Sequence, residues 1–112
     1  MKTISTGGNV LAGSYSFIGQ NAISNIKKYN ADIAFFSCHG LSESGLVTEN
    51  SQEENAIREA MMQQTKKSVL LIDNTKFNQT CFFNLCSLSD IDTVCSDVPL
   101  PAPLANMTKN LF

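Results

Sequence analysis

The chain has 112 residues, of which 43% are hydrophobic and 16% charged, and its net charge is −2 at pH 7. These values describe one globular domain with a single core, and they exclude a disordered chain. The sequence contains no basic cluster, which argues against a nucleic-acid-binding surface. No apolar run reaches 18 residues, so we expect no transmembrane helix and no membrane partner.

The N-terminus and the cysteines favour a cytoplasmic protein. The first two residues are followed by threonine, serine and glycine rather than by the apolar segment of a signal peptide. No C-x-x-C pair occurs among the four cysteines, Cys38, Cys81, Cys86 and Cys95. Buried, reduced thiols are the favoured interpretation, and a metal site formed by the first three with His39 is the weaker alternative. We therefore expect no metal and no cofactor.

The first part of the chain predicts a strand, a glycine loop and a helix. Met1–Thr6 is compatible with a short strand that ends at Gly7 and Gly8. Between Phe17 and Tyr29, apolar residues recur at the spacing of one helical face. They are Ile18, Ala22, Ile23 and Ile26.

A second strand is predicted at Asp32–Ser37, where the apolar run is almost unbroken. His39 and Gly40 follow this strand directly. The next segment, Leu41–Asn50, is rich in serine and glutamate and contains Gly45, so it is predicted to be a loop.

A helix is predicted to begin at Ser51. Ser51 and Glu54 have the S-x-x-E spacing of a capping box, in which the hydroxyl and the carboxylate each accept a hydrogen bond from a helix N–H. Apolar residues then form one helical stripe, Ala56, Ile57, Ala60 and Met61. Lys66 and Lys67 are predicted in the last turn, where positive charge is favourable.

The strand predicted next, Val69–Ile72, is apolar without alternation, as in a strand covered on both faces. It stops at a polar loop that contains Asp73 and Lys76. Further on, Cys81–Leu85 is predicted to be extended and Thr93–Ser96 to be a short strand. Prolines exclude a helix before about Ala102.

This alternation predicts an α/β fold with a three-layer, mostly parallel, Rossmann-like sheet flanked by helices, in a single domain at 1–112. In such a sheet the loops that follow the strands meet at one edge, where ligands bind. These loops supply glycine N–H groups, an imidazole, a carboxylate and an ammonium. Together they suit a small anionic ligand that is rich in hydroxyl groups.

Four stretches stand in this order along the chain: GGNVLAGSYSFIG, ADIAFFSCHGLSESGLVTEN, EENAIREAMMQQTKKSVLLIDNTKF and SLSDIDTVCSD. Together they resemble the effector-sensing domain of DeoR-type bacterial transcriptional regulators, over roughly Ile4 to Asp97. The most specific parts are the 40–54 loop and the ending Asp73-x-x-Lys76-Phe77.

The resemblance implies a fold like that of sugar-phosphate isomerases and coenzyme A transferases. It also implies a phosphorylated sugar or related metabolite as effector, a role as repressor of sugar-metabolism genes, and assembly as a homo-oligomer. The family's effector positions correspond to Gly7, Gly8, Gly40, Glu54, Asp73 and Lys76, and His39 lies beside them. The family's helix-turn-helix and the first part of its sensing domain are not found. We therefore expect a fragment that contacts DNA only through a missing N-terminal domain.

Simpler roles compete with these assignments. Asp73 can cap its own turn, Glu54 can be a helix cap alone, and His39 can be a structural histidine. The alternative function is that of a sugar-phosphate isomerase, which needs a carboxylate base next to a substrate C–H. A glutamate in a capping box is a poor candidate for that base, so a sensor without catalytic activity is the favoured hypothesis.

Overall fold

The computed structural model describes all residues from Met1 to Phe112. Its centre is a parallel sheet in the order β3-β6-β8, with strands β3 (Ala31–Phe36), β6 (Thr65–Ile72) and β8 (Thr93–Ser96). In the register of this sheet, Phe35 lies opposite Val69, and Leu70 lies opposite Val94. The predicted α/β fold, a parallel sheet flanked by helices, is confirmed.

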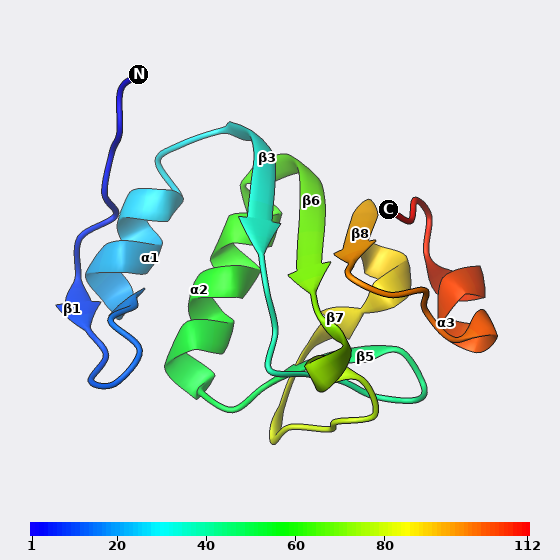
Figure 1. Cartoon of the computed structure of the whole chain (residues 1–112). Coiled ribbons are helices and arrows are strands. Elements are labelled where there is room, and N and C mark those ends of the chain that lie inside the picture. Colours follow the sequence, from blue (N-terminus) through cyan, green and yellow to red (C-terminus); the bar gives the residue numbers. More distant parts are fainter.

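Three helices accompany this sheet: α1 (Gln20–Ile26), α2 (Gln52–Gln63) and α3 (Ala102–Met107). Helix α2 runs along β3 and β6, and α1 packs against α2 on the side away from the sheet (Figure 1). Helix α3 begins directly after Pro101, as predicted from the prolines. None of these helices combines the length and the apolar character that a membrane span requires.

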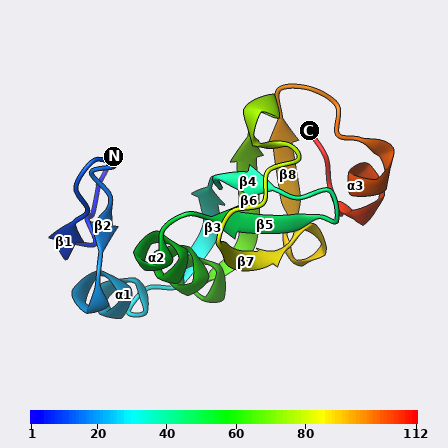
Figure 2. The same ribbon diagram turned by 90° about the horizontal axis from the view of Figure 1, so that it is seen from below.

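A second, antiparallel sheet lies under the C-terminal ends of the parallel strands (Figures 1 and 2). It has the order β4-β5-β7, with strands β4 (Gly40–Leu41), β5 (Leu46–Glu49) and β7 (Phe83–Ser87). A small hairpin near the N-terminus pairs β1 (Asn9–Val10) with β2 (Phe17–Ile18). Two 3-10 turns complete the structure, η1 (Asn74–Lys76) and η2 (Leu88–Asp90).

The structure corrects two predictions near the N-terminus. Met1–Thr6 forms no strand, because no neighbouring segment pairs with its backbone. The helix predicted over 17–29 begins only at Gln20, since Phe17 and Ile18 pair with the β1 strand. Gly19 separates the two elements with φ of +95°, a conformation that side chains other than glycine rarely adopt.

The segment 41–50 is a hairpin rather than the predicted loop. Its turn uses Gly45 with φ of +87°, and the Ser42 N–H donates to the Leu46 carbonyl at 2.9 Å. Leu41 and Val47, which face each other across the hairpin, are completely buried. Each strand of this hairpin is short and is flanked by polar turn residues. The sequence therefore has too few alternating apolar positions here to predict a strand.

Lys66 and Lys67 lie in a strand and not in the last turn of a helix, as had been predicted. Helix α2 ends at Gln63, and the Gln64 N–H closes it by donating to the Ala60 carbonyl. The Gln64 carbonyl then accepts from the Ala31 N–H, which starts the pairing of β6 with β3. Strand β6 is therefore longer than the apolar run inside it.

The core lies on one face of the parallel sheet. Leu70 is completely buried there, beneath α2 and the antiparallel sheet. On the opposite face, 43% of the surface of Leu71 and 59% of that of Phe35 are exposed. The prediction that the strand at 69–72 is covered on both faces is therefore wrong, because all the covering elements of this chain pack on the same side.

Candidate functional site

The loops that follow the parallel strands meet at one edge of the sheet, which we call the carboxyl edge. Strands β3 and β6 pair in parallel, so the 37–40 and 73–76 segments leave the sheet at the same end. Leu41 and Phe77 form a parallel bridge there, and the Gln79 N–H donates to the Leu41 carbonyl at 3.2 Å. The prediction that these two turns share one edge is confirmed.

A cavity of about 380 Å³ opens at this edge, and we call it the polar pocket. It lies between the N-terminal segment, the end of β3 and the first half of α2. Its polar lining consists of Thr6, Tyr15, Ser16, Ser37, Glu54 and Arg58. Its apolar lining consists of Phe17, Phe35, Phe36, Ile57 and Met61. Hydroxyl groups, a carboxylate and aromatic rings together can bind a polyol.

Glu54 enters the polar pocket from the first turn of α2. The Ser51 hydroxyl accepts from the Glu54 N–H at 3.2 Å, so the predicted N-cap is present. The Glu54 carboxylate does not return to the Ser51 N–H, and the predicted capping box is therefore only half formed. Instead, this carboxylate accepts from Ser16 Oγ at 3.3 Å and from Arg58 Nη1 at 3.3 Å.

A buried carboxylate behind the pocket holds two of its walls together. Glu49, at the end of β5, is completely buried. Its Oε2 lies 2.5 Å from His39 Nδ1, and its Oε1 lies 3.2 Å from Arg58 Nε. Glu49 therefore connects the loop after β3 to helix α2, and it fixes the guanidinium that contacts Glu54.

The environment keeps the Glu54 carboxyl ionised. Burial favours its neutral form and raises its pKa, but hydrogen bonds from Ser14, Arg58 and Ser16 act in the opposite direction. The net result is a pKa below the usual value of 4.5. Glu54 is therefore a permanent hydrogen-bond acceptor at neutral pH.

Asp73 and Lys76 form a separate turn at the same edge. The Asp73 carboxylate accepts from the Thr75 hydroxyl and, at 2.9 Å, from the Thr75 N–H. These hydrogen bonds lower its pKa, and the nearby Lys76 charge adds to the effect. The predicted capping role of Asp73 is thus confirmed. Lys76 is half-buried, and its ammonium takes part in no salt bridge.

Lys76 also lies near the segment that follows β3, because the adjacent Phe77 forms a parallel bridge with Leu41. Burial and the Glu49 charge raise the pKa of the Cys38 thiol to about 12, and Lys76 opposes that rise. Burial likewise raises the pKa of the Cys86 thiol to about 12. Neither thiol is a nucleophile or a ready metal ligand at neutral pH.

Two of the three glycines of the predicted site, Gly8 and Gly40, have packing roles. A Cβ on Gly40 would lie 2.5 Å from the Gln79 carbonyl oxygen, so only glycine fits there. A Cβ on Gly8 would lie 2.7 Å from the Ile18 carbonyl oxygen, next to the first turn of α1. Gly7 is open to its surroundings and has φ of +63°. It follows Thr6, whose side chain lines the polar pocket.

The structure thus brings together only part of the predicted set. Glu54 lines the polar pocket, and one of its carboxylate oxygens lies within 4.8 Å of ligand atoms of His39 and Glu49. Gly40, Asp73 and Lys76 lie at the same edge outside the pocket lining. Glu49 and Arg58 were missed in the sequence, although Arg58 stands four residues after Glu54 on a helix, a spacing that places two side chains together.

The cluster of His39, Glu49 and Glu54 has the donor atoms of a metal site. However, the Arg58 guanidinium already lies against both carboxylates, at 3.2 and 3.3 Å. This guanidinium supplies the positive charge that a metal ion would otherwise bring. The donor set therefore fits an internal ion-pair network better than a metal centre.

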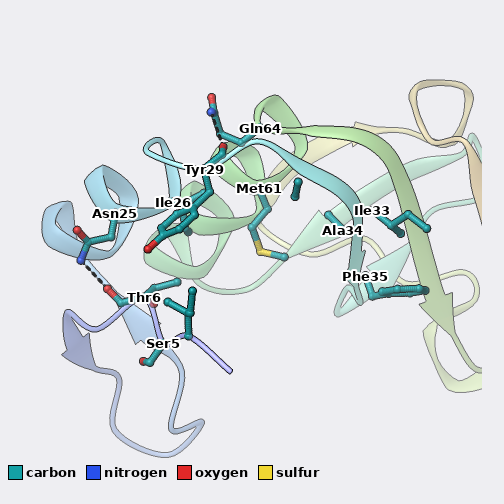
Figure 3. A pocket seen from close by; sticks show the side chains of 12 residues that line it. Ser5, Thr6, Asn25, Ile26, Tyr29, Ile33, Ala34, Phe35, Met61 and Gln64 are labelled. Carbon is teal, nitrogen blue, oxygen red and sulfur yellow. Dashed lines mark hydrogen bonds between the residues drawn. The ribbon is translucent and has the colours of Figure 1, made fainter. Parts of the chain in front are cut away.

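A second cavity, of about 390 Å³, adjoins the polar pocket and shares Thr6, Phe35 and Met61 with it. Figure 3 shows its mainly apolar walls between the N-terminal segment, α1 and β3. The amide of Asn25 donates to the Thr6 carbonyl at 2.7 Å, and that of Gln64 donates to the Lys27 and Tyr29 carbonyls. Because these amides are already used, this cavity offers little to a polar ligand.

Comparison with known proteins identifies the type of domain. A family model described as the DeoR C terminal sensor domain matches residues 1–98. An L-fucose operon activator of Haemophilus influenzae is 33% identical over 101 residues, which are 90% of this chain and 41% of that protein.

More distant relatives are regulators of the same kind. The HTH-type transcriptional repressor GlcR of Bacillus subtilis is 30% identical over 80% of this chain and 35% of its own length. The glycerol-3-phosphate regulon repressor of Escherichia coli is 24% identical over 89% of this chain and 40% of its own length. The chain thus spans about two-fifths of the length of such relatives.

Proposed function

Because the chain belongs to the DeoR family of transcriptional regulators, through their C-terminal sensor domain, we propose that it binds a phosphorylated sugar at the carboxyl edge of its parallel sheet. In the whole protein, binding would control a helix-turn-helix domain that contacts DNA. The relatives named above include an L-fucose operon activator and a glycerol-3-phosphate regulon repressor, which supports a sugar-related effector.

One observation carries the proposal: a lysine without an ion pair lies at the same edge as a pocket lined by hydroxyl groups. In the polar pocket, Arg58 is already paired with Glu49 and Glu54, so the pocket has no spare positive charge. Lys76 is the cation at this edge that no carboxylate holds. A phosphate group therefore belongs near Lys76, whose ammonium can donate hydrogen bonds to it.

The sugar part of the effector suits the polar pocket. The ionised Glu54 accepts hydrogen bonds from sugar hydroxyls, and Ser16 and Ser37 can donate or accept them. The ring of Phe17 supplies an apolar surface for the carbon face of a sugar. Asp73 and His39 flank the site, where Asp73 fixes the turn that presents Lys76.

Sensing is better supported than isomerisation. A general base works best when its pKa lies close to the working pH. The pKa of Glu54 is lowered, and its carboxylate is held by Arg58 and Ser16, so it is a weak base. The remaining features of the proposal, a repressor role and a homo-oligomeric assembly, concern the whole protein.

The test is a thermal-shift screen with ribose 5-phosphate, fructose 1-phosphate and glycerol 3-phosphate, together with the unphosphorylated compounds and inorganic phosphate. A binding phosphosugar at 100 times its Kd stabilises the folded state by about 2.7 kcal/mol. We expect a rise in Tm of several degrees with one phosphosugar and none with its unphosphorylated form.

Lys76→Ala should abolish this rise and leave the Tm without ligand nearly unchanged. Lys109→Ala, which removes an exposed lysine near the other end of the sheet, is the matched control and should keep the full response. An unaltered response of Lys76→Ala would refute the role given to Lys76. A screen without any hit among sugar phosphates would refute the proposed effector class.

A further inference from the structure

The N-terminal ends of the parallel strands form the opposite edge of the sheet, which we call the amino edge. Lys27 and Lys28 lie in the turn between α1 and β3, and Lys66 and Lys67 lie at the start of β6. The two turns are neighbours, because the Gln64 amide donates to the Lys27 carbonyl at 3.2 Å and the Ala31 N–H donates to the Gln64 carbonyl at 2.9 Å. Figure 1 shows both turns together above the sheet, at the end away from the carboxyl edge.

A fifth lysine extends this row. Lys109 precedes the segment 110–112, which pairs in parallel with β8. The amide of Asn110 donates to the Asp92 carbonyl at 2.9 Å, which places Lys109 at the start of β8. All five lysines are exposed. The two lysine pairs and Lys109 are far apart in the sequence, so the fold brings them to the same edge, in a chain whose net charge is −2.

Little of this charge is used within the chain. Four acidic residues belong to the elements that reach this edge: Asp32 and Asp92 stand directly before or at the start of strands, Glu59 lies near the end of α2, and Asp90 ends η2. Asp32 lies 3.7 Å from Lys66, and both side chains are at least 80% exposed, so the pair is weak. The Asp92 carboxylate points inward, where it accepts from the Ser68 N–H at 2.8 Å.

We propose that the amino edge, formed by Lys27, Lys28, Lys66, Lys67 and Lys109, is an interaction surface that contacts the phosphate backbone of duplex DNA without reading its sequence. Flexible, exposed lysines suit phosphates, which position a protein on DNA, whereas base reading needs side chains that enter a groove. Relatives of this chain are HTH-type transcriptional regulators, so we take duplex DNA as the polyanion for this surface. Because the surface faces away from the carboxyl edge, it can be occupied together with the effector site.

The test measures fluorescence anisotropy of an arbitrary duplex of about 20 base pairs with the 112-residue chain, at salt concentrations from about 20 to 200 mM. Each phosphate contact adds about −0.9 to the slope of log K against log salt, so four contacts predict a slope of about −4. Lys66→Gln with Lys67→Gln should reduce that slope by about 2 and weaken binding at low salt about tenfold. Lys27→Gln with Lys28→Gln should act similarly, so the result does not depend on the folding of one variant.

A matched control separates the surface from net charge. Gln79→Glu with Thr80→Glu adds two negative charges at exposed positions of the carboxyl edge, the same change in net charge as the double lysine variant. This control should keep the wild-type slope. The proposal is overturned if the wild-type chain does not bind DNA at about 20 mM salt, or if the control weakens binding as much as the lysine variants do. Tighter binding to a poly-glutamate peptide than to DNA would also overturn it, in favour of an acidic protein partner.

Discussion

The two edges of the parallel sheet use charged residues in different ways. At the carboxyl edge, Glu49 is completely buried, only 19% of the Arg58 side chain is exposed, and the Arg58 guanidinium pairs with both Glu49 and Glu54. At the amino edge, the lysines are exposed, and the single ion pair there joins two exposed side chains at 3.7 Å. The network of Glu49, Glu54 and Arg58 lies inside the fold, whereas the lysines of the amino edge lie in solvent.

Charged residues therefore have two different roles in this small domain. Paired, buried charges fix the position of nearby groups, and their loss is costly because a partner is left buried without compensation. Exposed lysines contribute little to folding and remain free for an external partner. We therefore expect substitutions in the network of Glu49, Glu54 and Arg58 to change stability and those at the amino edge to change only interactions.

The largest effect is expected for Glu49→Ala. This change leaves Arg58 without its buried partner and His39 without its hydrogen bond, so it should cost about 3 kcal/mol of unfolding free energy. Urea denaturation of both proteins measures this cost. Glu53→Ala, which removes an exposed carboxylate in the first turn of α2, is the control and should cost less than about 1 kcal/mol. Equal costs for both variants would contradict the assigned role of Glu49.

A smaller effect is expected for Gly40→Ala. The added Cβ would lie 2.5 Å from the Gln79 carbonyl oxygen, so the backbone must shift, at a cost of about 2 kcal/mol. Thermal unfolding should show a lower Tm, whereas Thr80→Ala, at an exposed position nearby, should leave it nearly unchanged. A wild-type Tm for Gly40→Ala would show that the turn at this edge is not closely packed.

The loss of stability at acid pH should also depend on the carboxyl edge, through Glu54. Because the folded state lowers the pKa of Glu54 below 4.5, the ionised form contributes stability above that pH. This contribution is lost as the pH falls through the folded pKa. Glu54→Gln should therefore make stability less dependent on pH below about pH 5, measured by urea denaturation between pH 3 and 7. An unchanged pH dependence would argue against the network around Glu54.

The smallest effect is expected at the amino edge. Lys66→Gln with Lys67→Gln removes two exposed charges and one weak ion pair, so the unfolding free energy should change by less than about 0.5 kcal/mol. Urea denaturation of this variant gives the comparison with Glu49→Ala. If the lysine variant were as unstable as Glu49→Ala, the proposed division between the two edges would be wrong.

The sequence predicted the elements with long or unbroken patterns. The apolar runs at 32–37 and 69–72 are strands, and the Ser51 cap begins a helix. From this order it also followed that the 38–40 and 73–76 turns share one edge. These features depend on neighbours in the chain, so local pattern and propensity were sufficient to find them.

The features that were missed depend on contacts between distant residues. Glu49 meets His39 and Arg58 only because the 41–50 segment folds into a hairpin, and its two short strands have too few residues to show a period. Leu71 lies on the exposed face of β6, although the unbroken apolar run predicts burial on both faces. An apolar run does not show which elements cover each face of a strand. The basic amino edge, likewise, exists only where two turns meet.

The most direct test of the effector site is a titration of the ¹⁵N-labelled chain with the phosphosugar that gives the largest thermal shift. If the carboxyl edge binds it, the backbone signals that move most will belong to residues 6–8, 37–40, 54–58 and 73–76, and those of the amino edge will stay in place. Signals that move mainly elsewhere, or move equally with the unphosphorylated sugar, would contradict a phosphosugar site at this edge.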